Sequence, residues 1–216
     1  MTKPASLLVA TNNRGKLREY AELLKGLPFE LTTLSGRGIT EEVEETGSSL
    51  KQNAIHKATT YAKLSGLTTM ADDSGLEVDA LGGEPGPLSR RYAGDNVSDK
   101  ERNDYLLAKL RNIPRDKRTA RFRCVIAIAM PEGKVKTCEG VCEGIIAFDA
   151  KGEEGFGYDP IFYLPEMDKR MAELSLAEKN RISHRAKAAQ KARRILERLA
   201  KNLGSGLQLL EGNSKL

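Results

Sequence analysis

Two adjacent carboxylates, Asp72 and Asp73, follow Ala71 and a short uncharged run, residues 67–70, that has the composition of a β-strand. Ser74 and Gly75 come next. Carboxylates this close repel each other and are poor strand formers, so we expect them at the end of the strand, where a cation offsets their charge. Mg²⁺ typically binds one or two carboxylates together with substrate phosphates. The pair therefore predicts a magnesium site next to a phosphate site.

A candidate phosphate-binding loop lies near the N-terminus. Residues 6–10 are typical of a buried strand, and apolar residues at i, i+3, i+4 and i+7 predict a helix over 15–25. The polar segment that joins them consists of Thr11, Asn12, Asn13, Arg14, Gly15 and Lys16. Free N–H groups and the positive end of a helix dipole bind anions, and Lys16 adds a full charge. The segment is not a P-loop, because Ala10 and Leu17 stand where that motif needs Gly and Ser or Thr.

A second group of acidic residues precedes the turn-prone pair Thr46-Gly47. Glu41 and Glu42 are typical of residues that complement a helix dipole. Glu44 and Glu45 stand closer to the turn, and with the Asp72-Asp73 pair they predict an oxygen-only site suited to Mg²⁺ or Mn²⁺. In the alternative interpretation, one of these carboxylates stays free of metal and activates water as a general base.

Four consecutive residues, Phe156, Gly157, Tyr158 and Asp159, combine two aromatic rings, a flexible backbone and a carboxylate. Taken alone, the segment is typical of a turn with two core aromatics. Beside a phosphate site it also suits an aromatic face that stacks on a base and an acceptor for a ring N–H.

His184 and Arg185 stand at the predicted start of the last helix, where the helix dipole disfavours cations, and this indicates a ligand. Arginine has only donors, so it can bind the keto oxygen of inosine, xanthine or guanine but cannot accept a bond from the amino group of adenine. The pattern predicts selection of 6-oxo purines. The basic residues that continue from Lys187 to Lys201 are interpreted first as a solvated helix face.

Composition excludes several classes of protein. The chain has 216 residues, 30% of them charged, a net charge of +5 and a pI of about 9. No apolar run approaches the roughly 20 residues that span a bilayer, and Met1 leads directly into a strand, so we expect neither a membrane span nor a signal peptide. The three cysteines, Cys124, Cys138 and Cys142, predict buried free thiols in a reducing cytoplasm.

The elements that must position these residues alternate along the chain. The apolar run 122–130 predicts a central strand buried on both faces, joined by a turn to a second long strand over 134–148. Capping-box pairs predict three helix starts, at Ser49 with Gln52, at Ser98 with Glu101 and at Ser175 with Glu178. This order predicts the α/β class with a mixed sheet.

The last helix is expected to begin at the cap residue Ser183 and to end at Gly204-Ser205-Gly206. Residues 1–203 therefore read as one domain, and 204–216 as a flexible tail.

Together these motifs resemble the inosine triphosphate pyrophosphatase family, enzymes that hydrolyse non-standard purine nucleoside triphosphates. The resemblance runs across most of the chain, and the number and order of its motifs make it specific. The motifs are residues 10–13 through Lys16, 44–47, 53–54, 71–76, 82–86, 89–94, 155–160, 178–180 and 182–185. The family often has a small residue where Arg90 stands.

The resemblance implies a fold and an activity. The fold is an elongated mixed sheet flanked by helices, in two lobes around a nucleotide-binding cleft. The activity is Mg²⁺-dependent cleavage of XTP, ITP or dITP to the monophosphate and diphosphate, in a cytoplasmic homodimer without a stable nucleic-acid partner.

It also implies roles for individual residues. Residues 11–16 would hold the phosphates, with Lys16 neutralising their charge during catalysis. Glu44 and Asp73 would bind the metal, and Asp73 would accept the proton of the attacking water. The nucleotide would contact Ser74, Phe156, Gly157, Tyr158, Asp159, Lys179, His184 and Arg185.

Three other functions stay open at this point. A related enzyme would cleave other modified nucleoside triphosphates. A nucleotide-binding protein without activity would have no need of the Asp72-Asp73 pair. A nucleic-acid-binding module would use the basic last helix, although no aromatic residue follows Tyr163 to stack on a single strand.

Overall fold

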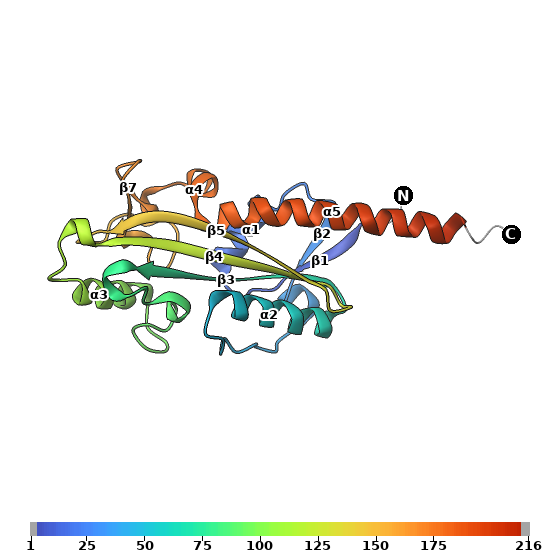
Figure 1. The fold of residues 1–216 in the computed structure, drawn as a ribbon, viewed down its shortest axis with the longest axis horizontal. Coiled ribbons are helices and arrows are strands. Elements are labelled where there is room, and N and C mark those ends of the chain that lie inside the picture. The colour runs from blue at the N-terminus through green and yellow to red at the C-terminus, as the bar shows by residue number, and fades with distance from the viewer. Residues whose placement is uncertain (1–3, 213–216) are drawn as a thin grey trace.

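A computed structural model describes residues 4–212, with the side chains of 203–212 left out. One mixed sheet runs through the molecule in the order β2-β1-β3-β4-β5-β6-β7 (Figure 1). β1 is parallel to both β2 and β3, and the other neighbours are antiparallel. The strands are β1 Ala5–Val9, β2 Phe29–Thr33, β3 Thr68–Val78, β4 Thr119–Ala129, β5 Val135–Ile146, β6 Phe162–Leu164 and β7 Lys169–Arg170. The predicted α/β class with a mixed sheet is confirmed.

Helices cover both faces of the sheet. They are α1 Arg14–Leu23, α2 Leu50–Ser65, α3 Asp99–Lys109, α4 Leu176–Ile182 and α5 His184–Gly212. Because side chains alternate along a strand, Met70 and Ile126 pack with α1 and α5, whereas Ala71 and Val125 pack with α2 on the opposite face. This two-sided packing is why 122–130 is apolar at nearly every position, as predicted.

A third hydrophobic cluster lies at the other end of the long strands. It joins Leu76 and Phe122 of the sheet to Leu106 of α3 and to Phe162 of β6. Strands β3, β4 and β5 run through both ends, so the molecule is elongated with a core at each end (Figure 1).

The cap predictions hold at most helix starts. Ser98 with Glu101 and Ser175 with Glu178 form complete capping boxes, and the Ser183 hydroxyl accepts from the Ala186 N–H. At α2 the prediction was half right.

Ser49 is the N-cap residue of α2 and accepts from the Gln52 N–H. The Gln52 side chain, however, accepts from both the N–H and the hydroxyl of Ser48. The second hydrogen bond of the capping box is therefore made with Ser48 and not with the N-cap residue Ser49.

Two predicted boundaries were wrong. β3 continues through Asp72 and Asp73 to Val78, because β4 pairs with it residue by residue, Asp72 opposite Ile126 and Asp73 opposite Val125. Helix α5 continues past Gly204-Ser205-Gly206 to Gly212. A helix glycine costs only about 1 kcal/mol, and the residues that follow are good helix formers.

The structure also bears on the predicted tail and on the three cysteines. Of the predicted tail, 204–212 lie within α5 and 213–216 lie outside the described residues, so a flexible tail stays a prediction. All three cysteines are free, with Cys124 and Cys142 buried and Cys138 half-buried. Among residues 4–212, no helix is both long and apolar enough to cross a bilayer.

Candidate active site

The polar loop after β1 meets β3 at the acidic pair. β1 pairs with β3 as far as Val9, opposite Met70, and the Ala10 N–H donates to the Met70 carbonyl at 2.8 Å. Beyond this point β3 continues without β1 beside it, and Lys16 Nζ reaches Asp72 Oδ2 at 2.9 Å. The structure thus brings the predicted phosphate loop to the acidic pair.

The loop residues themselves are ordered by short-range hydrogen bonds. Asn13 is the N-cap of α1, and its Oδ1 accepts from the Lys16 N–H at 3.0 Å. Thr11 Oγ1 accepts from the Asn13 N–H at 3.2 Å. Asn12 and Arg14 are exposed, so this end of α1 is open to an anion.

Asp72 is a buried carboxylate that faces cations. Its Oδ2 lies 2.9 Å from Lys16 Nζ and 3.7 Å from Arg185 Nε, on the face covered by α1 and α5. Burial alone would raise the pKa of Asp72, but Lys16 and Arg185 outweigh it and lower that pKa to about 2. Its Oδ1 is buried without a hydrogen-bond partner among the described residues. Asp72 is therefore a permanent negative charge.

Asp73 points to the opposite face, toward α2. Its Oδ2 accepts from Asn53 Nδ2 at 2.9 Å, and its Oδ1 lies 3.5 Å from Lys57 Nζ. Lys57 is held more closely by Glu45, at 2.6 Å. Burial raises the pKa of Asp73 above its ordinary value, and the Glu45 carboxylate adds to this, while Lys57 opposes it. A carboxylate of raised pKa is suited to accept a proton.

The four predicted metal-binding carboxylates do not form one cluster. Glu44 is exposed and has no hydrogen-bond or ion-pair partner in the part of the chain that the structure describes, whereas Glu45 is paired with Lys57. Within residues 4–212, no three acidic, histidine or cysteine side chains come together closely enough to hold an ion. Adjacent residues on a strand point to opposite faces, so the prediction that the whole group forms one site was wrong.

Glu19, which the sequence analysis did not single out, organises the other side of the site. Its buried carboxylate contacts Lys179 Nζ at 2.8 Å and Arg185 Nη1 at 2.6 Å. Arg185 Nη2 also donates to Ser74 Oγ at 2.9 Å. Glu19 follows Lys16 by three residues on α1, and this i, i+3 spacing was the signal available in the sequence.

His184 and Phe156 add aromatic surface near these cations. The His184 imidazole stacks on Phe122 with a centroid distance of 4.8 Å and an interplanar angle of 18°. Burial, reinforced by the neighbouring Arg185 and Lys179 charges, holds the pKa of His184 well below its ordinary value, so the ring is neutral. Its Nδ1 has no hydrogen-bond partner among the described residues.

The Phe156 ring connects the phosphate loop to the buried cations. Its centroid lies 4.7 Å from Lys179 Nζ, and the ring packs on Gly15 so closely that a Cβ there would come within 2.5 Å of it. A side chain at this position of the loop would have to displace the Phe156 ring.

The rest of the predicted 156–159 segment divides into two roles. Asp159 is buried, and its Oδ2 accepts from the Phe156 N–H at 2.9 Å and from Lys179 Nζ. Burial raises the pKa of Asp159, although Lys179 opposes this.

Gly157 and Tyr158 are held by neighbouring elements. The Gly157 N–H donates to Asp99 Oδ2 at 2.6 Å. Tyr158 lies in the core, and its hydroxyl donates to the Ser89 carbonyl at 2.9 Å, as the core interpretation of this aromatic predicted.

The structure therefore brings seven of the predicted residues together. Lys16, Ser74, Phe156, Asp159, Lys179, His184 and Arg185 form a connected group on the α1 and α5 face. Sequence analysis missed Glu19 and Lys57. In the 89–94 motif both Arg90 and Arg91 are exposed, and the Arg91 guanidinium donates to the Glu45 carbonyl at 3.0 Å.

Comparisons with known proteins agree on one family. The model of the Ham1 family matches residues 7–195. A dITP/XTP pyrophosphatase of Desulforamulus reducens is 52% identical over 193 residues, which are 89% of this chain and 96% of that protein. A dITP/XTP pyrophosphatase of Bacillus subtilis is 47% identical over 190 residues, covering 88% of this chain and 96% of that protein.

Solved structures give the same result for the fold. The Staphylococcus aureus Ham1 protein matches with a TM-score of 0.80 at 44% identity, covering 89% of this chain and 98% of that chain. A HAM1 protein from Coxiella burnetii matches with a TM-score of 0.82 at 42% identity over the same shares.

Proposed function

Because the chain belongs to the Ham1 family, we propose that the residues around Asp72 and Asp73 are its active site. The protein is a hydrolase of nucleoside triphosphates, a dITP/XTP pyrophosphatase. It converts XTP, ITP and dITP to the monophosphate and diphosphate, and so keeps non-standard purines out of DNA and RNA.

The observation that carries the site assignment is the contact of Lys16 with Asp72. Lys16 belongs to the loop that would hold phosphates, and the same carboxylate faces Arg185 on the purine side. One buried charge therefore links the two parts of a nucleotide site, while Asp73, with its raised pKa, lies on the other side of the strand.

The donor chemistry at Asp73 fits Mg²⁺, or Mn²⁺ in its place. The charge of Asp73 is incompletely neutralised, because Lys57 Nζ lies 3.5 Å from its Oδ1, and Glu44 is exposed to solvent. Two carboxylates and substrate phosphates are a usual set for this ion, so Glu44 and Asp73 would hold it. When bound, it would neutralise the negative charge of the phosphates.

The chain's own groups account for the remaining steps. Lys16 and the free N–H groups at the start of α1 bind and orient the triphosphate. Asp73 accepts a proton from the water that attacks the α-phosphorus. The bond from that phosphorus to the bridging oxygen breaks, and diphosphate leaves with the electron pair of this bond.

Selection of the base follows from the donors on the α1 and α5 face. Arg185 is held by Glu19 and Ser74 and offers N–H groups only, which suits the 6-keto oxygen of inosine or xanthine. Phe156 provides a ring face for stacking, and Asp159 an acceptor. Thr11, Asn12, Asn13 and Gly157 complete the proposed contacts.

The wider setting of the enzyme is also proposed. Free thiols support a reducing compartment such as the cytoplasm, and a homodimer is the assembly that the resemblance implies. The basic residues of α5 are not expected to hold a nucleic acid.

The experiment that tests this function is diphosphate release from ITP, XTP, dITP, GTP and ATP, with and without Mg²⁺. We expect metal-dependent release from the first three and little from ATP. Release of single phosphates would contradict attack at the α-phosphorus. Turnover confined to other modified nucleotides would indicate the related pyrophosphatase, and no turnover would leave a binding protein.

A further inference from the structure

The first turn of α5 lies directly against β5 at Gly140. A Cβ on Gly140 would come within 2.2 Å of the His184 carbonyl oxygen and 2.4 Å of the Ala188 nitrogen. Both are backbone atoms, so a side chain here would displace the helix itself. The φ of Gly140 is not positive, and the glycine is therefore required for close approach and not for an unusual backbone conformation.

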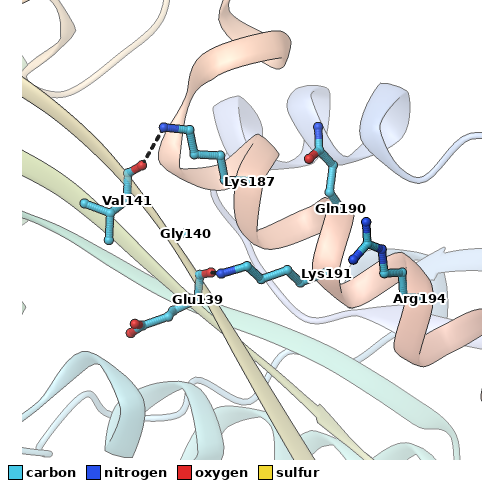
Figure 2. Close-up of a pocket in the computed structure, with 7 residues that line it drawn as sticks. All are labelled: Glu139, Gly140, Val141, Lys187, Gln190, Lys191 and Arg194. Carbon is cyan, nitrogen blue, oxygen red and sulfur yellow. Dashed lines mark hydrogen bonds between the residues drawn. The ribbon is translucent and has the colours of Figure 1, made fainter.

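Two lysines attach the start of α5 to the carbonyl groups on either side of Gly140. Lys187 Nζ donates to the Val141 carbonyl at 2.9 Å, and Lys191 Nζ donates to the Glu139 carbonyl at 2.7 Å (Figure 2). The lysines are one helical turn apart, and the two carbonyls are two residues apart on the strand. A shift of α5 along β5 would break both bonds.

These carbonyls are available because one edge of β5 is open there. In the described part of the chain, β5 pairs with β4 along its length, but on its other side it pairs with β6 only at Ile145 and Ile146. The lysine side chains occupy the place that a neighbouring strand would otherwise take.

The residues positioned by this contact are those that face the purine side of the site. The carbonyl that meets Gly140 belongs to His184, whose ring stacks on Phe122 of β4. Arg185 follows, and its guanidinium reaches Ser74 and Glu19. The depth of the helix on the strand therefore sets where both side chains lie.

We propose that Gly140, Lys187 and Lys191 are positioning residues that fix the depth and register of α5 on β5, and thereby the placement of His184 and Arg185 for purine selection. Gly140 sets the depth, and the two lysines set the register. The link to purine selection rests on the proposed function, whereas the link to the placement of His184 does not.

The first test is the environment of His184 in Gly140→Ala, measured by NMR. The chain has two histidines, and His56 is exposed on α2, so its ring signals serve as the internal control. Because the His184 ring stacks on Phe122, the ring current of Phe122 shifts the NMR signals of the His184 ring protons. We expect Gly140→Ala to move the His184 signals and leave those of His56 in place.

The second test is the ratio of kcat/KM for ITP to that for ATP. A misplacement of about 1 Å at a site costs on the order of 100-fold in rate, so we expect this ratio to fall about 10- to 100-fold in Gly140→Ala. A defect confined to stability would lower activity on both nucleotides equally. Unchanged His184 signals in Gly140→Ala would overturn the proposal. If the wild type prefers ITP to ATP, the same ITP to ATP ratio in Gly140→Ala would overturn it as well.

A milder variant decides the matter if Gly140→Ala does not fold. The Lys187→Met/Lys191→Met double variant removes both donors to β5 without adding volume. Its control is Arg194→Met, which removes a charge from the same exposed side of α5. We expect the double variant, and not the control, to shift His184 and to lower the ITP to ATP ratio. Equal behaviour of the two would contradict the role of the lysines.

If the wild type cleaves no nucleotide, the proposed function fails while the NMR test still stands.

Discussion

Asp72 and Asp73 are neighbours in the chain, yet their carboxylates lie on opposite faces of the sheet. Asp72 meets Lys16 and Arg185 under α1 and α5, and Asp73 meets Asn53 and Lys57 under α2. Their pKa values move in opposite directions, down for Asp72 and up for Asp73. In the proposed function the pair provides a fixed charge, Asp72, and a proton acceptor, Asp73, and different substitutions should separate the two roles.

Asp73→Asn tests the proton acceptor. The amide keeps the size of the side chain but cannot take a proton, and general bases contribute about 100- to 10,000-fold to rates. We expect diphosphate release from ITP to fall by at least about 100-fold, with a melting temperature close to that of the wild type. Near-native turnover in a folded variant would remove Asp73 from the mechanism.

Lys57→Met tests the electrostatic setting of Asp73 through the pH profile. Asp73 must be ionised to accept a proton, so kcat/KM is lost as the pH falls through its pKa. Lys57 opposes the effect of burial on that pKa. Removing it should raise the pKa of Asp73 further and move the acid limb of the profile to higher pH. Lys51→Met, an exposed change on the same helix, should leave the limb in place.

Glu44→Gln tests the proposed metal ligand. Glu44 is exposed and carries no ion pair among the described residues, so its loss should cost little stability. We expect the Mg²⁺ concentration for half-maximal activity to rise by about tenfold or more, because mutating even an outer-shell partner of a metal site typically costs about 10- to 100-fold in affinity. Glu42→Gln is the control in the same acidic segment. The same Mg²⁺ dependence in both variants would show that Glu44 does not bind the ion.

Asp72→Asn tests the fixed charge by unfolding in urea at several pH values. The folded-state pKa of Asp72, about 2, lies below its unfolded value, so the ionised group stabilises the fold above about pH 4. That contribution, about 2 kcal/mol, is lost as the pH falls toward about 2.

The variant should therefore be less stable than the wild type at neutral pH, with a difference that shrinks in acid. Asp116→Asn, an exposed control, should show no such trend. A constant difference at all pH values would assign the effect to packing.

Glu19→Gln tests the buried carboxylate between Lys179 and Arg185. Breaking a buried ion pair leaves an uncompensated charge and costs about 3–5 kcal/mol. In the variant Lys179 is still paired with Asp159, and Arg185 still lies beside Asp72. We therefore expect a loss at the lower end of this range, about 3 kcal/mol in the free energy of unfolding. Glu22→Gln, exposed on the same helix, should change it by less than about 0.5 kcal/mol.

The sequence predicted features that depend on local chemistry. Cap residues such as Ser98 and Ser175, the apolar run of β4, and the loop from Thr11 to Lys16 could all be placed because their signals lie within a few residues. The order of the motifs along the chain gave the family resemblance, and the predicted activity came from that resemblance and not from local patterns.

The errors arose where tertiary pairing decides the outcome. Asp72 and Asp73 look like a strand end, but β4 extends the strand through them, and the alternation of faces then separates the two carboxylates. Glu19 and Lys57 looked like ordinary helix charges. Their roles depend on partners more than ten residues away, such as Arg185 for Glu19 and Glu45 for Lys57.

The open edge of β5 has a consequence for the behaviour of the protein at high concentration. An unpaired strand edge is a template on which a second chain can add a strand and start aggregation, and lysines are a common protection. Lys187 and Lys191 cover two carbonyls of this edge. Variants that lose these lysines should therefore be less soluble as well as less selective.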